Sequence, residues 1–502
     1  MKNLFIDLRQ DLSASLVVFF VALPLCLGVA LASGAPLFSG IIAGIVGGIV
    51  VGALSGSTFG VSGPAAGLAV LVLGYITTLG GSFDSFLLAV VLAGVIQLIA
   101  GFLGFGTVAY YFPSSVIKGM LSGIGLLIII KQIPHAIGYD ANFKDDFGTE
   151  QLSGAVSQMF NYITPNVVII TLVSMLVIIL WEEFSVKKHR ILKAIPGPLI
   201  AVVIGIILSS FLYLEENHLV QIPVAANPGE FFGQFSFPNF SQITNPDIYA
   251  IALVLAVVAS LETLLSVEAT DKLDPKKRIT PTNRELKAQG VGNIISGLIG
   301  GLPVTQVIIR STANIEFGAK SKMSTILHGL LLLVSAIAIP SLLNKIPLAT
   351  LACILLLVGY KLAKPQIFRK IYAEGYEQFV PFMATIAGML IFDLLKGVGI
   401  GMVVAMAFII YHNFRNACSH VKEAEGANHK HKITLSEEVS FLNKGKILQI
   451  LNELPDDSKV LIDGSKSTSI HPDVKEIIKN FQTNSKARNI SLEIKGINLN
   501  HK

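Results

Sequence analysis

Apolar stretches of helical length, separated by short polar segments, follow one another from Leu12 to Phe414. The first stretch, Leu12–Ala32, has about 21 residues and no charged side chain, which is the length that a helix needs to cross a bilayer. It is longer than the apolar part of a secretory signal, which has about 7–15 residues. The pattern therefore predicts a membrane-spanning helix near the start of the chain.

The same pattern recurs and predicts about fourteen transmembrane segments in all. The other expected spans are Gly40–Ser55, Val61–Gly80, Ser85–Phe105, Tyr110–Gln132, Pro165–Trp181, Pro196–Leu214, Pro246–Ala269, Leu286–Ile299, Pro303–Phe317, Ser321–Leu343, Leu348–Leu362, Phe379–Leu395 and Val398–Phe414. The expected fold class is an all-α polytopic membrane protein with a lipid bilayer as its surroundings.

Composition supports this class. The chain of 502 residues is 52% hydrophobic and only 14% charged, and its mean hydropathy is +0.67. A net charge of +5 without a basic face rich in aromatic residues gives no reason to expect nucleic-acid binding. Cys26, Cys353 and Cys418 are few and far apart, so neither a disulfide framework nor a zinc site is expected.

The charges of the loops predict the orientation. If the N-terminus is cytoplasmic, the loops richest in basic residues fall on the cytoplasmic side; they contain Lys187, Lys188, Arg190, Lys193, Lys272, Lys276, Lys277, Arg278, Arg284, Lys287, Lys320, Lys322, Lys361, Lys364, Arg369 and Lys370. The two long loops on the other side, 134–163 and 215–247, are acidic and contain Lys144 as their only basic residue. Positive residues favour the cytoplasmic side. We therefore expect a multi-pass protein of the inner (plasma) membrane with both termini in the cytoplasm.

The composition changes after the last apolar stretch. Residues 1–418 are the expected transmembrane domain, 419–431 a polar linker and 432–502 a small cytoplasmic α/β domain. In this last part, alternating and helical patterns predict a strand at Lys459–Asp463, a helix at Pro472–Phe481 and a strand at Ile490–Ile497.

Fourteen spans divide into two sets of seven, and an odd number per set makes the two sets insert with opposite orientation. The third span of the first set begins Ser62-Gly63-Pro64-Ala65-Ala66-Gly67, and the third span of the second set begins Gly301-Leu302-Pro303-Val304-Thr305-Gln306. Short spans opened by Gly and Pro at corresponding positions are the best sequence-level indication of a transporter binding site. The pattern predicts a 7+7 inverted repeat, although Gly-Pro at a helix start is often only a cap after a turn.

A helix that starts inside the bilayer presents free N–H groups and the positive end of its dipole, which suits an anion. Arg310 adds positive charge behind the second helix start, unless it extends to the cytoplasmic surface instead. The predicted anion-binding residues are Ala65, Ala66, Gly67, Val304, Thr305, Gln306 and Arg310.

Glu262 lies within an apolar span, where a charge is costly and commonly functional. Ser266 follows four residues later, on the same helix face. The two residues are candidates for binding the coupling cation, either Na⁺ held by both oxygens or a proton carried by the carboxylate. The alternative is that Glu262 forms a structural ion pair, with Arg310 as one partner.

The motifs Ser62-Gly63-Pro64, 261–266 (LETLLS), 288–293 (AQGVGN), and Gly301-Leu302-Pro303 followed by Ile309-Arg310-Ser311 resemble those of the SulP sulfate-permease family along nearly the whole chain. The resemblance implies core and gate subdomains, an elevator-type motion, a homodimer, and a cytoplasmic STAS domain, here a short one. It also implies an anion between the starts of the third and tenth spans. Glu262 and Ser266 match positions that hold sodium in bicarbonate-transporting members, and Arg310 matches an arginine beside the anion in animal members.

The predicted function is therefore secondary active transport of a small inorganic oxyanion, sulfate first and bicarbonate next, coupled to Na⁺ or H⁺. No cofactor is expected apart from Na⁺ as a coupling ion, and no nucleophile–base constellation indicates an enzyme. Three alternatives stay open: a nucleobase carrier of similar fold, a passive anion channel, and a membrane receptor whose output is the STAS-like domain.

Overall fold

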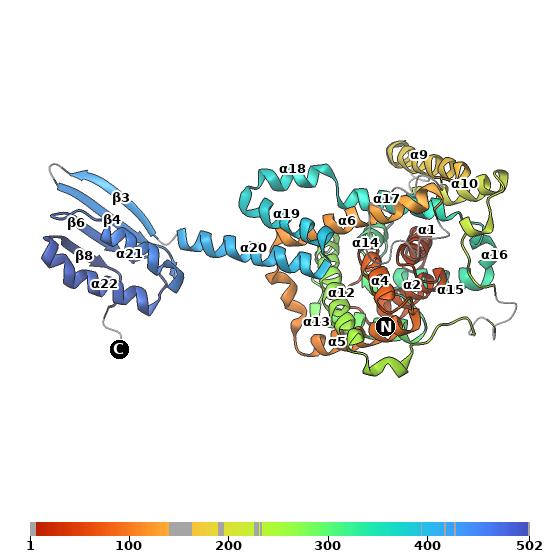
Figure 1. The fold of residues 1–502 in the computed structure, drawn as a ribbon, viewed down its shortest axis with the longest axis horizontal. Coiled ribbons are helices and arrows are strands. Elements are labelled where there is room, and N and C mark those ends of the chain that lie inside the picture. The colour runs from red at the N-terminus through yellow and green to blue at the C-terminus, as the bar shows by residue number, and fades with distance from the viewer. Residues whose placement is uncertain are drawn as a thin grey trace. The chain divides into compact units, whose positions relative to one another are not determined.

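The computed structural model describes residues 7–139, 163–188, 195–224, 230, 233–392, 394–415, 418–425 and 428–499. It forms two compact units, one of Met1–Ala373 with Phe382–Gly399 and one of Glu374–Pro381 with Ile400–Lys502 (Figure 1). Most of the predicted loop 134–163 lies outside the described residues. Arg190 and Lys193, in a later loop, lie outside them as well.

The first unit is helical, as predicted. In its first half the elements are α1 (Leu8–Ala32), α2 (Leu37–Val46), the π-helix η1 (Gly47–Val51), α3 (Gly52–Leu54), α4 (Ala66–Thr78), α5 (Phe83–Phe102), η2 (Phe105–Tyr111), α6 (Ser114–Ile137), α9 (Pro165–Lys188) and α10 (Gly197–Phe211). The elements that follow are η5 (Glu216–His218), η6 (Phe240–Thr244), α12 (Pro246–Leu273), α13 (Thr282–Leu298), α14 (Ile308–Glu316), α15 (Met323–Ala338), α16 (Pro340–Leu343), α17 (Leu348–Leu362) and α18 (Pro365–Ala373). Helices α19 (Tyr376–Ile391) and α20 (Leu394–Arg415) contribute residues to both units.

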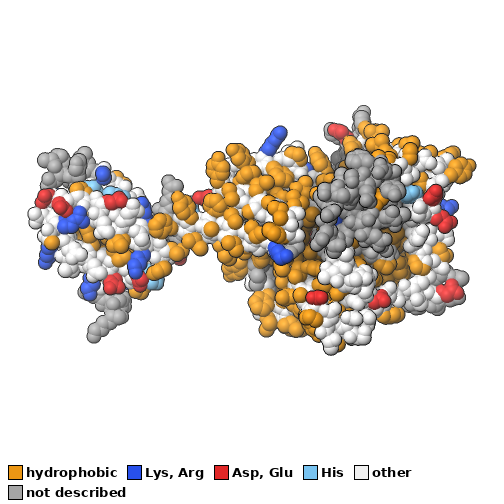
Figure 2. Space-filling view, viewed as in Figure 1, with side chains coloured by type: hydrophobic (Ala, Val, Ile, Leu, Met, Phe, Trp, Pro, Cys, Tyr) orange, Lys and Arg blue, Asp and Glu red, His pale blue; other side chains and the backbone are white. Residues whose placement is uncertain are grey.

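Every predicted apolar span contains a helix, and in the described part of the chain 7 helices are long and apolar enough to cross a membrane. Shorter apolar helices include Ala66–Thr78, Pro165–Trp181, Gly197–Phe211 and Met323–Ala338. Hydrophobic side chains cover much of the visible face of the first unit (Figure 2). Large exposed ones such as Leu172, Ile207 and Phe211 are typical of helices that face lipid. The number of about fourteen spans stays a prediction.

Glycines let α5 and α13 approach until their backbones touch. A methyl group built on Gly94 would lie 2.6 Å from the carbonyl oxygen of Gly290, and one built on Gly290 would lie 2.7 Å from the backbone nitrogen of Leu98. Neither position has room for a larger side chain, because the nearest atoms belong to the backbone. Small residues at helix contacts of this kind are common in membrane proteins, and here they bring polar side chains of the two helices together.

Two short strands interrupt the helical unit. β1 (Ser62–Pro64) precedes α4, and β2 (Val304–Gln306) precedes α14. They pair antiparallel, with Ser62 opposite Gln306 and Pro64 opposite Val304. An antiparallel pair formed by corresponding segments of the two halves supports the predicted inverted repeat, because a two-fold axis in the membrane plane relates such halves. We call this pair, β1 with β2, the chain break.

The predicted start of the tenth span is wrong. The sequence places Pro303 in the first turn of a helix, but the chain is extended from Val304 to Gln306 and α14 begins at Ile308. β-Branched Val304 suits an extended backbone, and its N–H donates to a side chain, Asn293 Oδ1, at 2.6 Å. Arg310 consequently lies in the first turn of α14.

The second unit contains a four-stranded sheet of order β3-β4-β6-β8, with α21 (Lys444–Asn452) and α22 (Pro472–Ser485) in its core (Figure 1). Its strands are β3 (Cys418–Glu425), β4 (Asn428–Leu435), β6 (Lys459–Asp463) and β8 (Ser491–Lys495), with β5 (Glu438–Val439) and β7 (Ser469–Ile470) as a second pair and η7 (Phe441–Asn443) and η8 (Lys486–Arg488) as short turns. The predicted strand, helix and strand of 432–502 correspond to β6, α22 and β8.

The predicted linker 419–431 is wrong as a structural assignment. Its described residues lie in β3 and β4, which pair from Cys418 with Leu435 to Glu425 with Asn428, and β4 then pairs with β6. The polar composition suggested a linker because β3 is an edge strand, and polar residues are common on such strands.

Candidate functional site

The start of α4 carries the first part of the site. Ala65 is the N-cap residue in an extended conformation, and Ala66 and Gly67 form the first turn, as predicted. Their N–H groups have no partner within the helix, because the first turn of any α-helix lacks one. With no long side chain here, a ligand can approach the backbone closely.

Glu262 of α12 faces this helix start. A methyl group built on Gly67 would lie 2.6 Å from Glu262 Oε1 and 3.2 Å from Oε2, so the carboxylate touches the first turn of α4. Glu262 Oε2 is buried and has no hydrogen-bond partner among the described residues. Ser266 is buried one turn further along α12. The structure thus brings Glu262 to the predicted anion site, and cation binding by Glu262 with Ser266 stays a prediction.

Arg310 belongs to α14, the helix that follows β2. Its side chain is 1% exposed, and Nη2 donates to the carbonyl oxygen of Pro64 at 3.4 Å. A methyl group built on Gly63 would lie 2.2 Å from Arg310 Nη1. Arg310 therefore lies against β1, directly before α4, and does not extend to the surface.

Two of the nitrogens of this guanidinium, Nε and Nη1, have no acceptor among the described residues. No ion pair between Arg310 and Glu262 occurs in the part of the chain that the structure describes, since Glu262 Oε2 also lacks a partner. A buried guanidinium with unused donors is unusual, because buried charges are nearly always paired. Such an arrangement is suited to a ligand that supplies the missing negative charge.

The structure places the remaining predicted residues differently from one another. Thr305 is fully buried, and its Oγ1 has no partner among the described residues. The Gln306 side chain contacts Thr270 and Gly60: its Nε2 donates to Thr270 Oγ1 at 3.1 Å, and a methyl group built on Gly60 would meet its Oε1. Val304 presents its backbone to Asn293. Of the second half's predicted residues, Arg310 has unused charged donors and Thr305 has an unused hydroxyl among the described residues.

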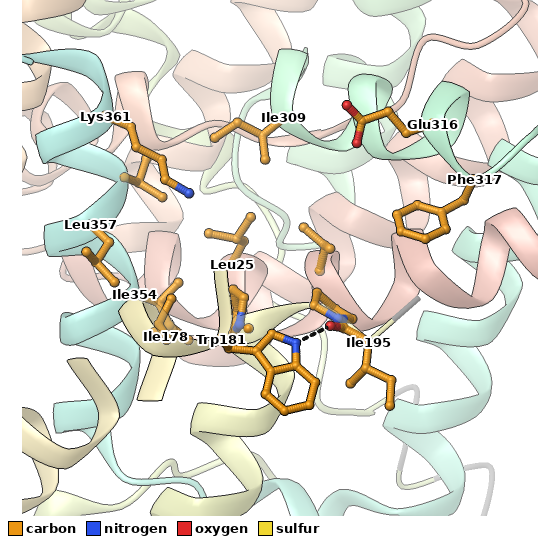
Figure 3. Close-up of a pocket in the computed structure, with 15 residues that line it drawn as sticks. Leu25, Ile178, Trp181, Ile195, Ile309, Glu316, Phe317, Ile354, Leu357 and Lys361 are labelled. Carbon is orange, nitrogen blue, oxygen red and sulfur yellow. Dashed lines mark hydrogen bonds between the residues drawn. The ribbon is translucent and has the colours of Figure 1, made fainter. Parts of the chain in front are cut away.

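A cavity of about 690 Å³ borders the start of α14, and we call it the α14 cavity. Residues of α1 and α14 form one wall, and residues of α9, α10 and α17 form the other. Figure 3 shows Ile309 between Lys361 and Glu316 in this view, and the Trp181 Nε1–H donates to the carbonyl oxygen of Ile195 at 2.8 Å. The cavity reaches the residue next to Arg310.

A second cavity of about 570 Å³ borders the start of α4, and we call it the α4 cavity. It extends from Gly67 along α4 to Thr78, and Val254 of α12 also lines it. Its other wall comes from α6, with Lys131, and from α19 and α20. The two short helices that follow the chain break, α4 and α14 (the half-helices), therefore each have a cavity beside the first turn.

Sequence reasoning did not find the polar residues of α13 that support the chain break. Glu285 is fully buried and accepts from Ser55 Oγ at 2.5 Å and from Gln289 Nε2 at 3.0 Å. Gln289 Nε2 also donates to Ser62 Oγ of β1 at 2.8 Å. The signal was the spacing of Glu285, Gln289 and Asn293, four residues apart and thus on one helix face.

The fold and the site define a class of protein: a polytopic helical membrane protein whose two half-helices begin at a shared, buried and charged site, a plan that recurs in secondary transporters. The chain belongs to the sulfate permease family, whose model, described as "Sulfate permease family", matches residues 8–385. It is therefore a membrane transporter of an anion-transporting family and not an enzyme.

Two known proteins are similar in sequence to most of this chain. The bicarbonate transporter BicA of Picosynechococcus sp. is 26% identical over 457 residues, which are 90% of this chain and 78% of that protein. The protein YvdB of Bacillus subtilis is 28% identical over 405 residues, which are 80% of this chain and 73% of that protein.

Solved structures show the same fold. The transmembrane domain of a cyanobacterium bicarbonate transporter BicA matches with a TM-score of 0.65 and 24% identity, over 80% of this chain and 97% of that chain. The murine anion transporter Slc26a9 in the inward-facing state matches with a TM-score of 0.78 and 18% identity, over 99% of this chain and 86% of that chain.

Proposed function

We propose that the protein is a secondary active transporter of a small inorganic oxyanion, sulfate first and bicarbonate next, coupled to Na⁺ or H⁺. The observation that carries the proposal is Arg310: a buried guanidinium with two unused donors, beside the chain break and close to the start of α4. Charge-assisted hydrogen bonds from a guanidinium to an oxyanion are among the strongest in proteins. The family description supports sulfate, and the likeness to BicA supports bicarbonate.

Glu262 and Ser266 are the proposed cation site. The carboxylate oxygen Oε2 is buried without a partner, and it lies beside the anion's proposed position at Gly67. A bound Na⁺ or a proton on this carboxylate reduces the repulsion between Glu262 and an anion. Cation binding then favours anion binding, which is the thermodynamic basis of coupled transport.

The proposed transport step is an elevator-type motion of a core subdomain against a gate subdomain in a homodimer. In both cavities one wall belongs to α1, α4, α12 or α14, and the other belongs to α6, α9, α10, α17, α19 or α20. Movement of the first set against the second opens one cavity as the other closes. The proposed location is the inner (plasma) membrane with cytoplasmic termini, as the loop charges indicate.

Uptake into proteoliposomes tests the proposal. Labelled sulfate and bicarbonate compete with dicarboxylates while the sodium and pH gradients are varied separately, and labelled uracil tests the nucleobase alternative. We expect uptake of an oxyanion that is accumulated only with a cation gradient. Uracil uptake without sulfate or bicarbonate uptake contradicts the proposal, and flux that never exceeds equilibrium indicates a channel.

Replacement of Glu262 tests the coupling. Glu262→Gln removes the negative charge and keeps the shape, so gradient-driven uptake is expected to disappear while anion exchange at equal cation concentration remains. Glu268→Gln on the same helix is the matched control, because Glu268 is half exposed and pairs with Lys272. Full coupling in Glu262→Gln excludes this residue from the mechanism.

A further inference from the structure

β2 has two edges, and only one of them faces β1. At the other edge, the Val304 N–H donates to Asn293 Oδ1 at 2.6 Å, and Asn293 Nδ2 donates to the Val304 carbonyl oxygen at 3.1 Å. One side-chain carboxamide thus makes the pair of hydrogen bonds that a residue of a third strand makes in an antiparallel sheet. Asn293 is 1% exposed, so these two bonds are shielded from bulk water.

A second carboxamide fixes the first. Gln97 of α5 accepts from Asn293 Nδ2 at 2.6 Å and donates through Nε2 to Ser260 Oγ of α12 at 3.1 Å. Gln97 is also 1% exposed. The contact depends on the glycine packing of α5 against α13, because Gly94 and Gly290 let these backbones touch. Three helices are thereby joined to β2 through one chain of buried amides.

The direction of each hydrogen bond follows from the donors and acceptors of the chain. Val304 N–H needs an acceptor, so Asn293 must present Oδ1 to it and use Nδ2 for both the Val304 carbonyl and Gln97 Oε1. A carboxylate at position 293 cannot donate. A carboxylate at position 97 still accepts from Asn293 and can accept from the Ser260 hydroxyl instead of donating to it.

We propose that Asn293 and Gln97 are positioning residues for the anion site, and that they hold β2 so that Arg310 keeps its place beside Pro64. Only a short segment separates β2 from the first turn of α14, so a displacement of Val304 moves the guanidinium. Gln289, one turn before Asn293, holds β1 through Ser62. α13 therefore holds both strands of the chain break. The effect on transport rests on the proposed function, whereas the contacts do not.

Two isosteric variants test the proposal. They are a matched pair because each introduces a buried carboxylate, so a difference between them reflects the hydrogen bonds and not the added charge. Asn293→Asp removes the donors to Val304 and Gln97, whereas Gln97→Glu keeps the acceptor for Asn293. Hydrogen exchange of the peptide 302–307 in the full chain is expected to rise about tenfold in Asn293→Asp and to stay near wild type in Gln97→Glu. This readout needs no transport.

Transport kinetics provide the second readout. In Asn293→Asp the KM for the transported anion is expected to rise about tenfold at a nearly unchanged maximal rate per folded protein. General damage to the fold reduces the amount of active protein and leaves KM as it was. If Asn293→Asp is not recovered folded, Gln97→Leu replaces it, because it removes the acceptor without adding charge and should raise both exchange and KM.

The proposal is overturned if Asn293→Asp exchanges like wild type at 302–307, if its KM is unchanged, or if Gln97→Glu is equally impaired. Unchanged exchange in Gln97→Leu overturns it as well. Failure of the proposed function gives a different result: the wild type then carries neither sulfate nor bicarbonate, and the exchange measurements still decide whether Asn293 holds β2.

Discussion

Two charged side chains, Arg310 and Glu262, have buried atoms that no described residue satisfies. In a folded protein, an unsatisfied buried polar atom costs about 1–3 kcal/mol, and more when it is charged. Both lie beside the chain break, where we propose that the transported ions bind. In that proposal, an oxyanion beside Arg310 and a cation beside Glu262 would satisfy both groups at once.

Gly67 provides a test at the scale of one atom. In Gly67→Ala the new methyl group would lie 2.6 Å from Glu262 Oε1, and the flexible carboxylate can move away from it. The helix should remain stable, because alanine favours helices by about 0.5–1 kcal/mol over glycine. We therefore expect a folded protein with a lower apparent affinity for the coupling cation, measured as a several-fold higher cation concentration for half-maximal uptake.

Gly74 of the same helix is the matched control. No atom lies within 4 Å of a methyl group built there, and its backbone is helical. Gly74→Ala should keep the cation dependence of the wild type. Equal effects of the two substitutions would contradict the contact between Glu262 and the start of α4.

The helices themselves could be predicted, because apolar length is a local property of the sequence. The chain break could not, since β2 needs β1 and the side chain of Asn293 as partners, and these come from distant segments. In both halves Gly and Pro marked a short strand, β1 or β2, that precedes the helix, and the helix itself starts a few residues later. The polar run at 419–431 misled for a related reason, because its pairing with β6 is also long-range.

The charged residues of the candidate site could be predicted because each one is recognisable in the sequence without knowledge of its partners. Glu262 and Arg310 are rare charges within apolar spans, so the sequence identifies them one at a time. The bond between Gln97 and Asn293 joins residues 196 positions apart, and it forms only because two glycine faces meet. The position of an amide side chain in an apolar span does not indicate which residue will be its hydrogen-bond partner.

The hairpin of β3 and β4 should respond to pH. His420 Nε2 and His431 Nδ1 are 2.9 Å apart, so one nitrogen donates to the other. The two nitrogens therefore cannot carry protons at the same time. Partial burial and the charge of Lys422 hold the pKa of His420 below its ordinary value, against the opposite influence of Glu453. Protonation therefore favours the unfolded hairpin, and stability is lost as the pH falls below about 6.5.

Hydrogen exchange of residues 418–435 in the full chain, corrected for the intrinsic effect of pH, measures this loss. Protection should decrease between about pH 6.5 and pH 5, and His420→Gln should remove the dependence. His471→Asn is the control, because asparagine can keep the N-cap contact that His471 makes with the Asp473 N–H. A pH dependence that persists in His420→Gln contradicts the assignment to this pair.

For the whole molecule, the two cavities predict opposite accessibility. The α14 cavity includes Lys361, and the α4 cavity extends to Thr78. The orientation predicted from the loop charges would put Lys361 on the cytoplasmic side and Thr78 on the opposite side. In a background without cysteine, a membrane-impermeant thiol reagent should label Val358→Cys from the side of the C-terminus and Val70→Cys from the other side.

A substrate anion and its coupling cation should change both labelling rates in opposite directions, because opening of one cavity closes the other. Phe237→Cys is a suitable control, since Phe237 is 62% exposed in the predicted loop 215–247 and lines neither cavity. Labelling of both cavity positions from the same side would contradict the arrangement of two opposed cavities.

The most direct measurement is a structure of the protein determined with sulfate or bicarbonate and with Na⁺. The account predicts anion density within hydrogen-bond distance of Arg310 Nε or Nη1 and of the N–H groups of Ala66 and Gly67, and it predicts that this density is absent in Arg310→Gln. An anion bound elsewhere, with both of these guanidinium nitrogens still without a partner, would contradict it.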